Sequence, residues 1–291
     1  MIYKLADIQG PLLDLRRNGL PQGHLTGWNV VDEIYRPELG FFTVITGIPS
    51  HGKSEFLDML LVNMGILHGW KFGVYSPENY PIESHFNRLI ERYCGDKCRC
   101  IMTDEYKMGA AFVDRHFHFI YPKDDAGRSI DDILDHMLQA KRLYGMEGFV
   151  IDPWNELDHR REHGLSETEY VSQVLSKIRF FCRENKVHGW LVAHPTKMQK
   201  DKETGQYEIP TPYNIAGSAA FYNKADHCVT VHREDLTKNE PILLVQKAKF
   251  KNFGKIGNAQ LYYQYVSGRI SEVDKYFDLP VKGYQKEDKE W

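Results

Sequence analysis

Residues 41–54 read Phe41-Phe42-Thr43-Val44-Ile45-Thr46-Gly47-Ile48-Pro49-Ser50-His51-Gly52-Lys53-Ser54, and this stretch decides the fold class of the chain. An aromatic and β-branched run, which predicts a buried strand, leads into the pattern G-x-x-x-x-G-K-S. A helical pattern from Glu55 to Leu67 follows directly. Strand, loop and helix in this order form the context in which the motif makes a phosphate-binding loop.

The loop contains the residue types that a phosphate cradle needs. Gly47 and Gly52 allow tight backbone turns, so that successive N–H groups converge on phosphate oxygens. Lys53 is expected to reach the β- and γ-phosphates, and the Ser54 hydroxyl to bind Mg²⁺. A chance loop of glycine and serine is the alternative, and the flanking strand and helix disfavour it. We therefore predict that residues 47–54 bind ATP, or another NTP or dNTP, together with Mg²⁺.

Length and composition add broad limits. The 291 residues, 42% of them hydrophobic, suffice for one large core. The net charge is −3, from 37 Lys and Arg against 40 Asp and Glu, so nucleic-acid binding would need a local concentration of positive charge. No apolar run approaches the ~20 residues of a membrane span, and Met1-Ile2-Tyr3-Lys4 begins no signal peptide. We expect a soluble, cytoplasmic protein that binds no membrane.

The five cysteines fit a reducing compartment. Cys94, Cys98 and Cys100 lie close together in C-G-D-K-C-R-C, a spacing that raises the question of a metal. No second C-x-x-C pair or regularly spaced His pair completes a tetrahedral set, which disfavours zinc. Free thiols are the expectation.

Beyond the phosphate loop, strand and helix patterns alternate. Strands are predicted at 71–76, 116–121, 148–154 and 190–194, and helices at 81–94, 129–144 and 166–185. Ser129 with Asp132, and Ser166 with Glu169, form N-terminal capping patterns for two of these helices. The alternation predicts an α/β fold with a central, mainly parallel sheet and helices on both faces.

After residue 226 the pattern changes to HCVTVH, ILLVQKAKF and LYYQYV, with short turns between them. These segments predict an antiparallel C-terminal extension of the same sheet. We expect one ATPase domain over residues 27–275, preceded by a lead segment at 1–26 and followed by a charged tail at 276–291.

Ligands of such sheets bind beyond the carboxyl ends of the strands, so the polar residues at those ends are candidates for the site. Asp152 ends the strand FVI and is the candidate that orders Mg²⁺ opposite Ser54. Pro153 follows it, where many P-loop ATPases have a catalytic Glu. Glu78 follows the strand KFGVYS, which we expect beside the phosphate loop, and is our candidate general base. The alternative for Glu78 is a role as a helix cap only.

His194 ends the strand WLVA, which we expect beside the strand that carries Asp152. It is a candidate γ-phosphate sensor, with a purely structural histidine as an equally open alternative. The loop that follows, 195–215, is too long for an idle connection and contains Lys197, Lys200 and Lys202. A second polar loop, 155–164, contains Arg160 and Arg161. Both loops are candidates for binding single-stranded DNA, with solvated surface loops as the alternative.

With these motifs in order, the chain resembles the ATPase domain of hexameric replicative DNA helicases. This RecA-like P-loop NTPase family includes DnaB, phage primase–helicases and the Twinkle-type helicases. The resemblance runs from about Gly23 to about Val273 and rests on GxxxxGKS, SPEN, VIDPWNE, LVAHPTK, GSAAFYNKAD and QKAKFK. The segments FVIDPWNELDH and LVAHPTKMQKDK are most similar to the Twinkle-type, toprim-linked branch. The resemblance implies an ATP-driven motor that moves 5′–3′ on single-stranded DNA, as a hexameric or heptameric ring, and unwinds duplex.

The resemblance also assigns roles residue by residue. It implies the phosphate-loop and magnesium roles for Lys53 and Ser54, and the catalytic, metal and sensor roles for Glu78, Asp152 and His194. It places a polar position of the fourth helicase motif on Asn223, a base sandwich on Arg233 and Tyr263, and a trans-acting cation on Lys249 beside Lys247. Two positions depart from the family: His51 replaces a small residue, and Lys249 replaces the arginine of a K-x-R pattern.

Further expectations follow from what usually surrounds such a motor. A primase-like toprim domain usually precedes it, and this chain leaves no room for one. We expect either one part of a longer primase–helicase or a stand-alone phage-style motor with a primase partner. Residues 12–17 could form a small helix that docks on a neighbouring subunit. The rival readings are a RecA-like recombination or regulatory ATPase without unwinding activity, and a nucleotide-binding module without motor activity.

Overall fold

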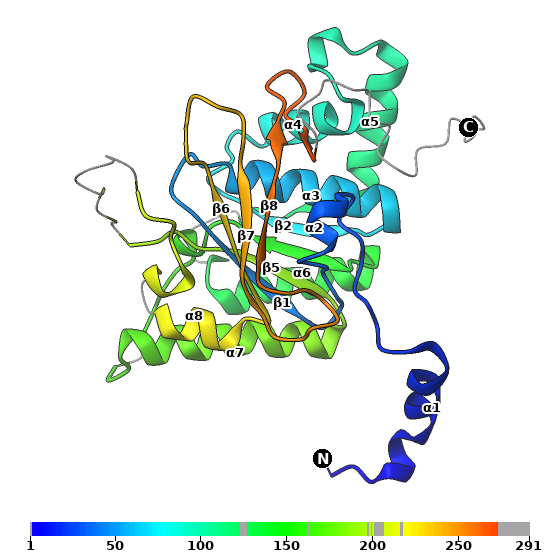
Figure 1. The fold of residues 1–291 in the computed structure, drawn as a ribbon, viewed down its shortest axis with the longest axis vertical. Helices are drawn as coiled ribbons and strands as arrows, with labels where there is room; N and C mark the ends of the chain where they lie inside the picture. Colours follow the sequence, from blue (N-terminus) through cyan, green and yellow to red (C-terminus); the bar gives the residue numbers. More distant parts are fainter. Residues whose placement is uncertain are drawn as a thin grey trace.

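An eight-stranded sheet forms the centre of the molecule in the computed structural model, which describes residues 2–122, 127–161, 163–196, 198, 200, 207–215 and 218–272 (Figure 1). The strand order is β3-β2-β4-β5-β1-β6-β7-β8. The strands are β1 (Phe42–Thr46), β2 (Phe72–Tyr75), β3 (Phe117–Phe119), β4 (Gly148–Ile151), β5 (His188–Val192), β6 (His227–His232), β7 (Ile242–Ala248) and β8 (Gly257–Gln260). All neighbouring pairs from β3 to β6 are parallel, and β7 and β8 are antiparallel to their neighbours.

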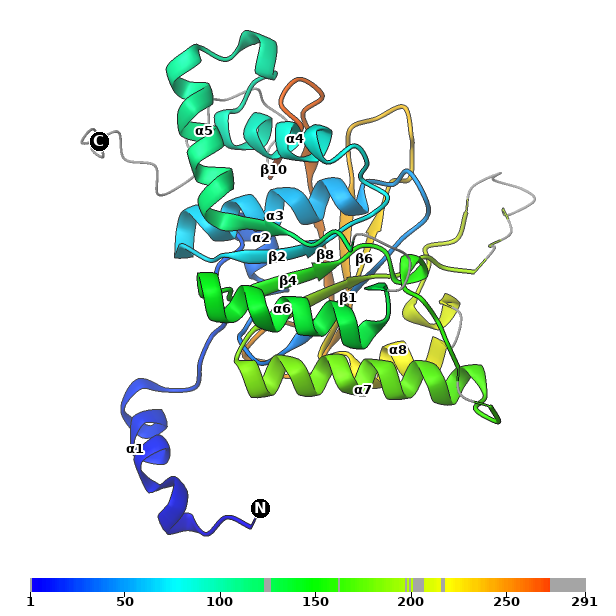
Figure 2. The ribbon, with the colours of Figure 1, turned by 180° about the vertical axis from the view of Figure 1, so that it is seen from behind.

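Helices cover both faces of this sheet. One face carries α3, α4 and α5, and the other carries α6, α7 and α8 (Figure 2). Their bounds are α3 (Lys53–His68), α4 (Ile82–Cys94), α5 (Thr103–His116), α6 (Ile130–Tyr144), α7 (Glu167–Asn185) and α8 (Ser218–Lys224). Shorter elements are η1 (Leu5–Ile8), α1 (Gln9–Asn18), α2 (Asn29–Asp32), η2 (Cys98–Cys100), η4 (Trp154–Glu156) and η5 (Pro212–Asn214). Ser129 caps α6 through the Asp132 N–H, and Ser166 forms a capping box with Glu169 on α7, as predicted.

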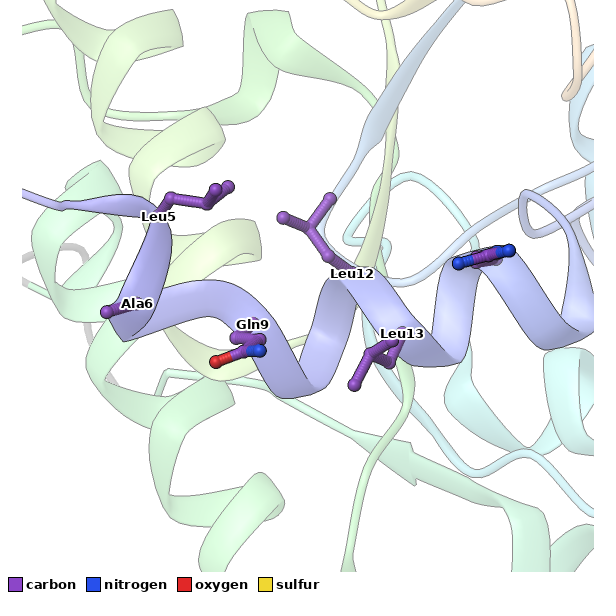
Figure 3. Close-up of a pocket in the computed structure, with 6 residues that line it drawn as sticks. Leu5, Ala6, Gln9, Leu12 and Leu13 are labelled. Atoms are coloured by element: carbon purple, nitrogen blue, oxygen red, sulfur yellow. The ribbon is translucent and has the colours of Figure 1, made fainter.

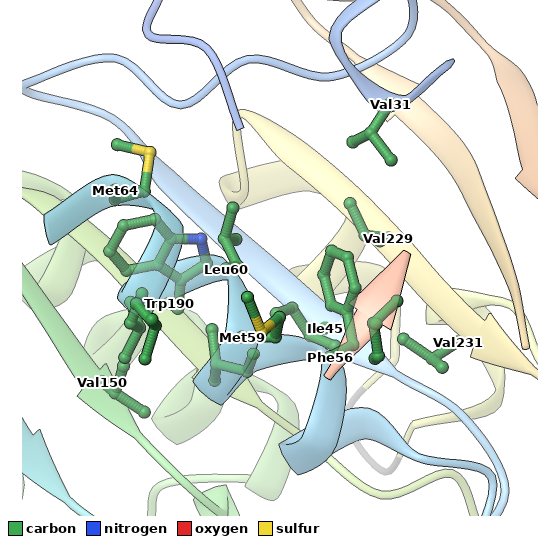
Figure 4. Close-up of a cluster of buried hydrophobic side chains, with 14 of the residues drawn as sticks. Val31, Ile45, Phe56, Met59, Leu60, Met64, Val150, Trp190, Val229 and Val231 are labelled. Atoms are coloured by element: carbon green, nitrogen blue, oxygen red, sulfur yellow. The ribbon is translucent and has the colours of Figure 1, made fainter. Parts of the chain in front are cut away.

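Two hydrophobic cores lie on the two faces of the sheet. Alternate residues of each strand point to opposite faces. Ile45 of β1 therefore packs with Phe56 and Leu60 of α3 in one core (Figure 4), and Val44 packs in the other. Because both faces are covered, β1 is buried along its whole length and reads as a continuous apolar run. The phosphate loop thus begins at the end of a fully buried strand.

The α/β fold class predicted from the sequence is confirmed, with three differences of detail. β6 is parallel to β1 because α8 carries the chain back across the sheet before β6 begins, so the antiparallel part starts only at β7. The segment LYYQYV does not join the main sheet. It contributes β9 (Tyr262–Tyr263), which pairs with β10 (Ile270–Ser271) through a turn at Gly268, and β8 forms the sheet edge instead.

The third difference is α5, which the strand-and-helix pattern did not predict. Among its 14 residues only Gly109, Val113 and His116 are buried, so its apolar periodicity is weak. Gly109 allows close packing on α4, because a Cβ at this position would lie 2.8 Å from Cys94 Sγ and 3.0 Å from Ile90 Cγ2. Tertiary packing on α4, rather than an amphipathic pattern, stabilises this helix.

The N-terminal helix α1 stands away from the rest of the fold (Figures 1 and 2). Leu5, Leu12 and Leu13 are exposed, and they line a shallow apolar pocket with Ala6, Gln9 and Arg16 (Figure 3). The structure therefore contains the small helix predicted around residues 12–17, and its docking on a neighbour stays a prediction. Across the described residues, no helix has the length and apolar character needed to cross a membrane.

Candidate nucleotide-binding and catalytic site

The phosphate loop connects β1 to α3, as predicted. Gly47 has φ +150°, and a Cβ there would lie 2.3 Å from the Val231 carbonyl oxygen of β6, so no other residue fits. Gly52 precedes α3 in the left-handed conformation with φ +94°. The loop therefore turns back over the first N–H groups of α3, where the helix dipole and free donors favour a phosphate.

Lys53 is poised inside this loop. Its Nζ donates hydrogen bonds to the carbonyl oxygens of Gly47 at 2.9 Å and Ile48 at 3.1 Å, and the side chain is buried. Burial lowers the pKa of Lys53 to about 8, although the Asp152 and Glu78 carboxylates partly oppose this shift. The amine thus lies in a place from which phosphate oxygens could replace its two carbonyl partners.

Ser54 and Asp152 form the candidate magnesium site. The Ser54 hydroxyl donates a hydrogen bond of 2.8 Å to Asp152 Oδ2, which joins the start of α3 to the end of β4. Burial raises the pKa of Asp152 to about 6, and the Ser54 hydrogen bond opposes the shift. A hydroxyl and a carboxylate are hard oxygen donors of the kind that Mg²⁺ prefers, so the residues present fit this ion. When bound, Mg²⁺ would neutralise charge on the phosphates.

Glu78 and His194 lie together beside this cradle. Glu78 Oε2 is 3.9 Å from His194 Nε2. The positive charge of Lys53 acts to lower the pKa of both side chains, so all three lie close together. Burial and the nearby Glu156 carboxylate raise the pKa of Glu78, which favours a base rather than a permanently paired anion. His194 has its Nδ1 buried without a hydrogen-bond partner among the described residues.

The route by which Glu78 reaches the site differs from the expectation. The prediction that its strand lies beside the phosphate-loop strand is wrong, because β4 and β5 separate β2 from β1. Glu78 instead reaches across on the turn after β2, which Tyr121 fixes by donating to the Ser76 carbonyl oxygen at 2.9 Å. His194 follows β5, and β5 does lie beside β4, as predicted.

The two residues predicted to hold the base flank the start of α3. Tyr263 donates a hydrogen bond of 3.2 Å to Glu55 Oε2, the residue after Ser54. Arg233 follows β6, and its guanidinium donates to the carbonyl oxygens of Leu236, at 2.8 Å, and Lys238. The Arg233 backbone N–H also donates to His51 of the phosphate loop at 3.0 Å, so both residues lie near that loop, and their role in binding a base stays a prediction.

Asn223, Lys247 and Lys249 lie elsewhere. Lys247 pairs in register with Cys228 near the start of β6, whereas the phosphate loop lies at its end. Lys247 Nζ contacts the Asn223 carbonyl oxygen at 3.4 Å. Lys249 Nζ lies 3.6 Å from Asp226 Oδ1, a fully buried carboxylate that sequence reasoning missed. The three residues are thus outside the cradle of their own subunit.

The two candidate DNA loops leave the ends of β4 and β5, as predicted. Arg160 and Arg161 are exposed, and Arg160 pairs with Asp158 at 2.6 Å. In the longer loop, the backbones of Lys200 and Tyr207 form an isolated antiparallel β-bridge. The Lys200 Nζ lies 5.2 Å from the centroid of the Tyr207 ring. Lys197 and Lys202 lie outside the described residues. The cation over an aromatic ring is compatible with base stacking along this loop.

A cluster of three charged contacts between α3 and α4 also escaped sequence reasoning. His85 Nε2 lies 3.0 Å from Asp58 Oδ1, and the fully buried Arg92 pairs with Glu55 and, at 3.8 Å, with Asp58. The sequence contains a signal for this pairing. Glu55 and Asp58 are three residues apart on one face of α3, and the basic residues His85 and Arg92 are seven apart on one face of α4. These contacts fix α4, which follows the Glu78 turn, against the helix that begins at the phosphate loop.

All five cysteines are free thiols. Cys94 ends α4, where its Sγ donates to the Glu105 carbonyl oxygen at 3.4 Å, and Cys98 lies in η2. Burial raises the pKa of Cys94 and of Cys98 to about 11. Thiols with such pKa values carry little thiolate near neutral pH, so they are weak nucleophiles and weak metal ligands there.

The comparison with curated proteins identifies a relative by sequence. Over 270 residues, 88% of this chain, the chain is 37% identical to the "Twinkle homolog protein, chloroplastic/mitochondrial" of Arabidopsis thaliana. The matched region is 37% of that relative, so the chain spans little more than a third of its length. No protein-family model matches the chain.

Solved structures share the fold at lower identity. The ATPase domain of G40P superposes with a TM-score of 0.75 at 18% identity, over 94% of this chain and all of that domain. A DnaB-like replicative helicase, described with its interactions with primase, gives 0.72 at 19% identity, over 93% of this chain and 67% of its own. The RadB recombinase gives 0.57 at 14% identity, over 86% of this chain and 99% of its own. By sequence the chain is similar to a Twinkle homolog over 88% of its own length, and it shares its fold with the G40P ATPase domain and the DnaB-like helicase, which confirms the predicted RecA-like α/β fold.

Proposed function

We propose that the chain hydrolyses ATP, or another NTP, and uses the energy to move on single-stranded DNA and unwind duplex. The observation that carries the proposal is the joint placement of a phosphate loop, a Ser54–Asp152 pair at 2.8 Å and a Glu78–His194 pair at 3.9 Å around one buried lysine. A module that only binds nucleotide has no use for a carboxylate positioned as a base.

Each residue has a distinct part in this proposal. Lys53 and the loop N–H groups hold the phosphates, and Ser54 and Asp152 hold Mg²⁺. Glu78 orients a water molecule and accepts its proton, for which its raised pKa is suited. His194 donates from Nε2 toward the γ-phosphate and, through Glu78, responds to its loss. Arg233 and Tyr263 hold the base.

The proposal extends to an oligomer. Lys249 lies outside the cradle of its own subunit and would supply the trans-acting cation of a neighbour, with Lys247 and Asn223 beside it. The exposed apolar side chains of α1 would pack on an adjacent subunit. A ring, hexameric or heptameric, would surround DNA with Lys200, Arg160 and Arg161, together with the two lysines outside the described residues, Lys197 and Lys202.

Translocation from 5′ to 3′ and the partnership with a primase complete the proposal. The fold shared with a helicase described with its primase interactions supports the partnership. The polarity rests on the resemblance of the sequence motifs to hexameric replicative helicases. The cytoplasmic location in a bacterial or phage-infected cell, inferred from the sequence, also stays a proposal, since the plant relative is named for chloroplasts and mitochondria.

Two measurements on the full chain test the function. Hydrolysis should rise at least several-fold with single-stranded DNA, and a forked duplex should be separated only when a hydrolysable NTP is present. Forks with only a 5′ or only a 3′ tail on the loading strand then report polarity. Native mass with nucleotide and oligonucleotide reports the ring.

The alternative is a RecA-like recombination or regulatory ATPase. The shared fold of the RadB recombinase is the observation in its favour. This rival predicts nucleotide-dependent filaments or dimers on DNA and no strand separation. Hydrolysis stimulated by DNA with no unwinding of any fork would therefore favour it over the motor.

A further inference from the structure

A continuous chain of contacts runs from His51 of the phosphate loop to Glu55 in the first turn of α3. Residue His51 of that loop accepts a hydrogen bond of 3.0 Å from the Arg233 backbone N–H at its Nδ1. The Arg233 guanidinium closes the loop 233–239 by donating to the Leu236 and Lys238 carbonyl oxygens. Tyr263 then donates its N–H to the Asn239 carbonyl oxygen at 2.8 Å, and its hydroxyl returns to Glu55 in the first turn of α3.

Among the described residues, the only hydrogen bond between a side chain of the phosphate loop and the loop 233–239 is the one that His51 accepts. The imidazole is 4% exposed, and its ring centroid lies 5.1 Å from that of His232. Burial, together with His232, Lys53 and Arg233, lowers the pKa of His51 to about 4. The neutral ring at neutral pH can accept at Nδ1, which an imidazolium could not do.

Two polar atoms of the same loop lack partners. Arg233 Nε and Asn239 Oδ1 are buried and form no hydrogen bond with any described residue. Buried polar atoms are nearly always paired, so a pair of orphans in one loop points to a ligand with polar edges. A nucleobase has such edges, and the His51–Arg233 hydrogen bond holds this loop beside the phosphate loop.

We infer that His51 is a positioning residue that fixes the loop 233–239 against the phosphate loop, so that base recognition and phosphate binding are coupled, with Asn239 as a further base contact. This inference rests on the proposed nucleotide-binding function. A small apolar residue at position 51 would have no side-chain acceptor for the Arg233 N–H, so the link depends on the histidine that distinguishes this phosphate loop.

The test compares two ligands, ADP and inorganic pyrophosphate, of which only ADP carries a nucleoside. Calorimetry on the full chain measures the affinities of ADP and of inorganic pyrophosphate, each with Mg²⁺. His51→Leu removes the acceptor at similar volume and should weaken ADP about 3- to 10-fold, the worth of one hydrogen bond, while pyrophosphate changes less than twofold. His51→Asn, whose Oδ1 can replace Nδ1, should restore ADP binding. Asn239→Ala should also weaken ADP and spare pyrophosphate.

His136 offers a matched control, since it is an exposed histidine on α6. His136→Leu should leave both affinities unchanged. Equal loss of ADP and pyrophosphate in His51→Leu, or no loss of either, would overturn the coupling role. So would a His51→Asn protein as weak as His51→Leu. Failure of the wild-type chain to bind either ligand would instead refute the proposed function itself.

Discussion

Because the pKa of Lys53 is low, the affinity of the site for nucleotide should depend on pH near neutrality, and the size of the change can be calculated. In the free protein, burial lowers this pKa to about 8. Phosphates beside the amine favour its charged form, so the pKa rises when nucleotide binds. Binding above pH 8 must therefore take up a proton, and the affinity contributed by Lys53 is complete below that pH and falls as pH rises.

The size of the effect follows from the free-state pKa. About 10% of Lys53 is uncharged at pH 7 and about 90% at pH 9, so the apparent affinity for the magnesium complex of ADP should fall about tenfold, or ~1.4 kcal/mol, between these values. Calorimetry at each pH measures the affinity. Repeating it in buffers of different ionisation enthalpy measures the proton uptake, which should approach about one per site at pH 9.

Lys53→Arg provides the control, because a guanidinium keeps its charge throughout this range. Its affinity can be lower than that of the wild type, but the slope against pH should disappear. A wild-type affinity that is flat from pH 7 to 9, or one that falls only above pH 10, would show that the amine has its ordinary pKa. The account of Lys53 as a desolvated, poised cation would then be wrong.

Four further outcomes are expected. Glu78→Gln should lower kcat by about 10² to 10⁴ in steady-state assays while nucleotide binding persists, and a wild-type rate would reject Glu78 as the base. Lys249→Met should abolish DNA-stimulated hydrolysis but not nucleotide binding, and mixing it with Lys53→Ala subunits should restore part of the rate; no rescue would contradict the trans role. Lys200→Glu should weaken single-stranded DNA and reduce the magnitude of the salt slope by about one, and an unchanged slope would move the DNA path elsewhere. Arg92→Met removes a buried guanidinium from Glu55 and from the buried Asp58, which keeps His85 as a partner, and should cost about 3 kcal/mol in denaturant unfolding, whereas a loss under ~1 kcal/mol would refute the pairing.

Local patterns in the sequence predicted much of this fold. The phosphate loop and the caps at Ser129 and Ser166 depend on residues within a few positions of one another. The chemistry of a cap or a tight turn is complete in such a window, so the spacing alone is informative. The Ser54–Asp152 pair also followed, because the carboxyl end of a parallel strand and the phosphate loop share one edge of the sheet.

Strand order could not be predicted in the same way. Whether β2 lies beside β1 depends on how far each crossover carries the chain, and no residue in β2 encodes its neighbour. Contacts such as Tyr263 with Glu55, separated by 208 positions, likewise exist only after the sheet has assembled. His51 was visible as a departure from a family pattern, but its partner, a backbone N–H at Arg233, has no signature in the sequence.

The geometry of β6 separates Lys249 from the nucleotide cradle of its own subunit. Its last residues adjoin the phosphate loop, and its first residues pair with the end of β7 near Lys249. Six residues of strand place these two ends about 16 Å apart. A rigid, buried strand cannot bring Lys249 to the phosphates of its own subunit, and Asp226 holds its amine at 3.6 Å. If Lys249 contributes to hydrolysis, as proposed, it must do so at the cradle of a neighbouring subunit, so the proposal predicts that full hydrolysis requires the assembly.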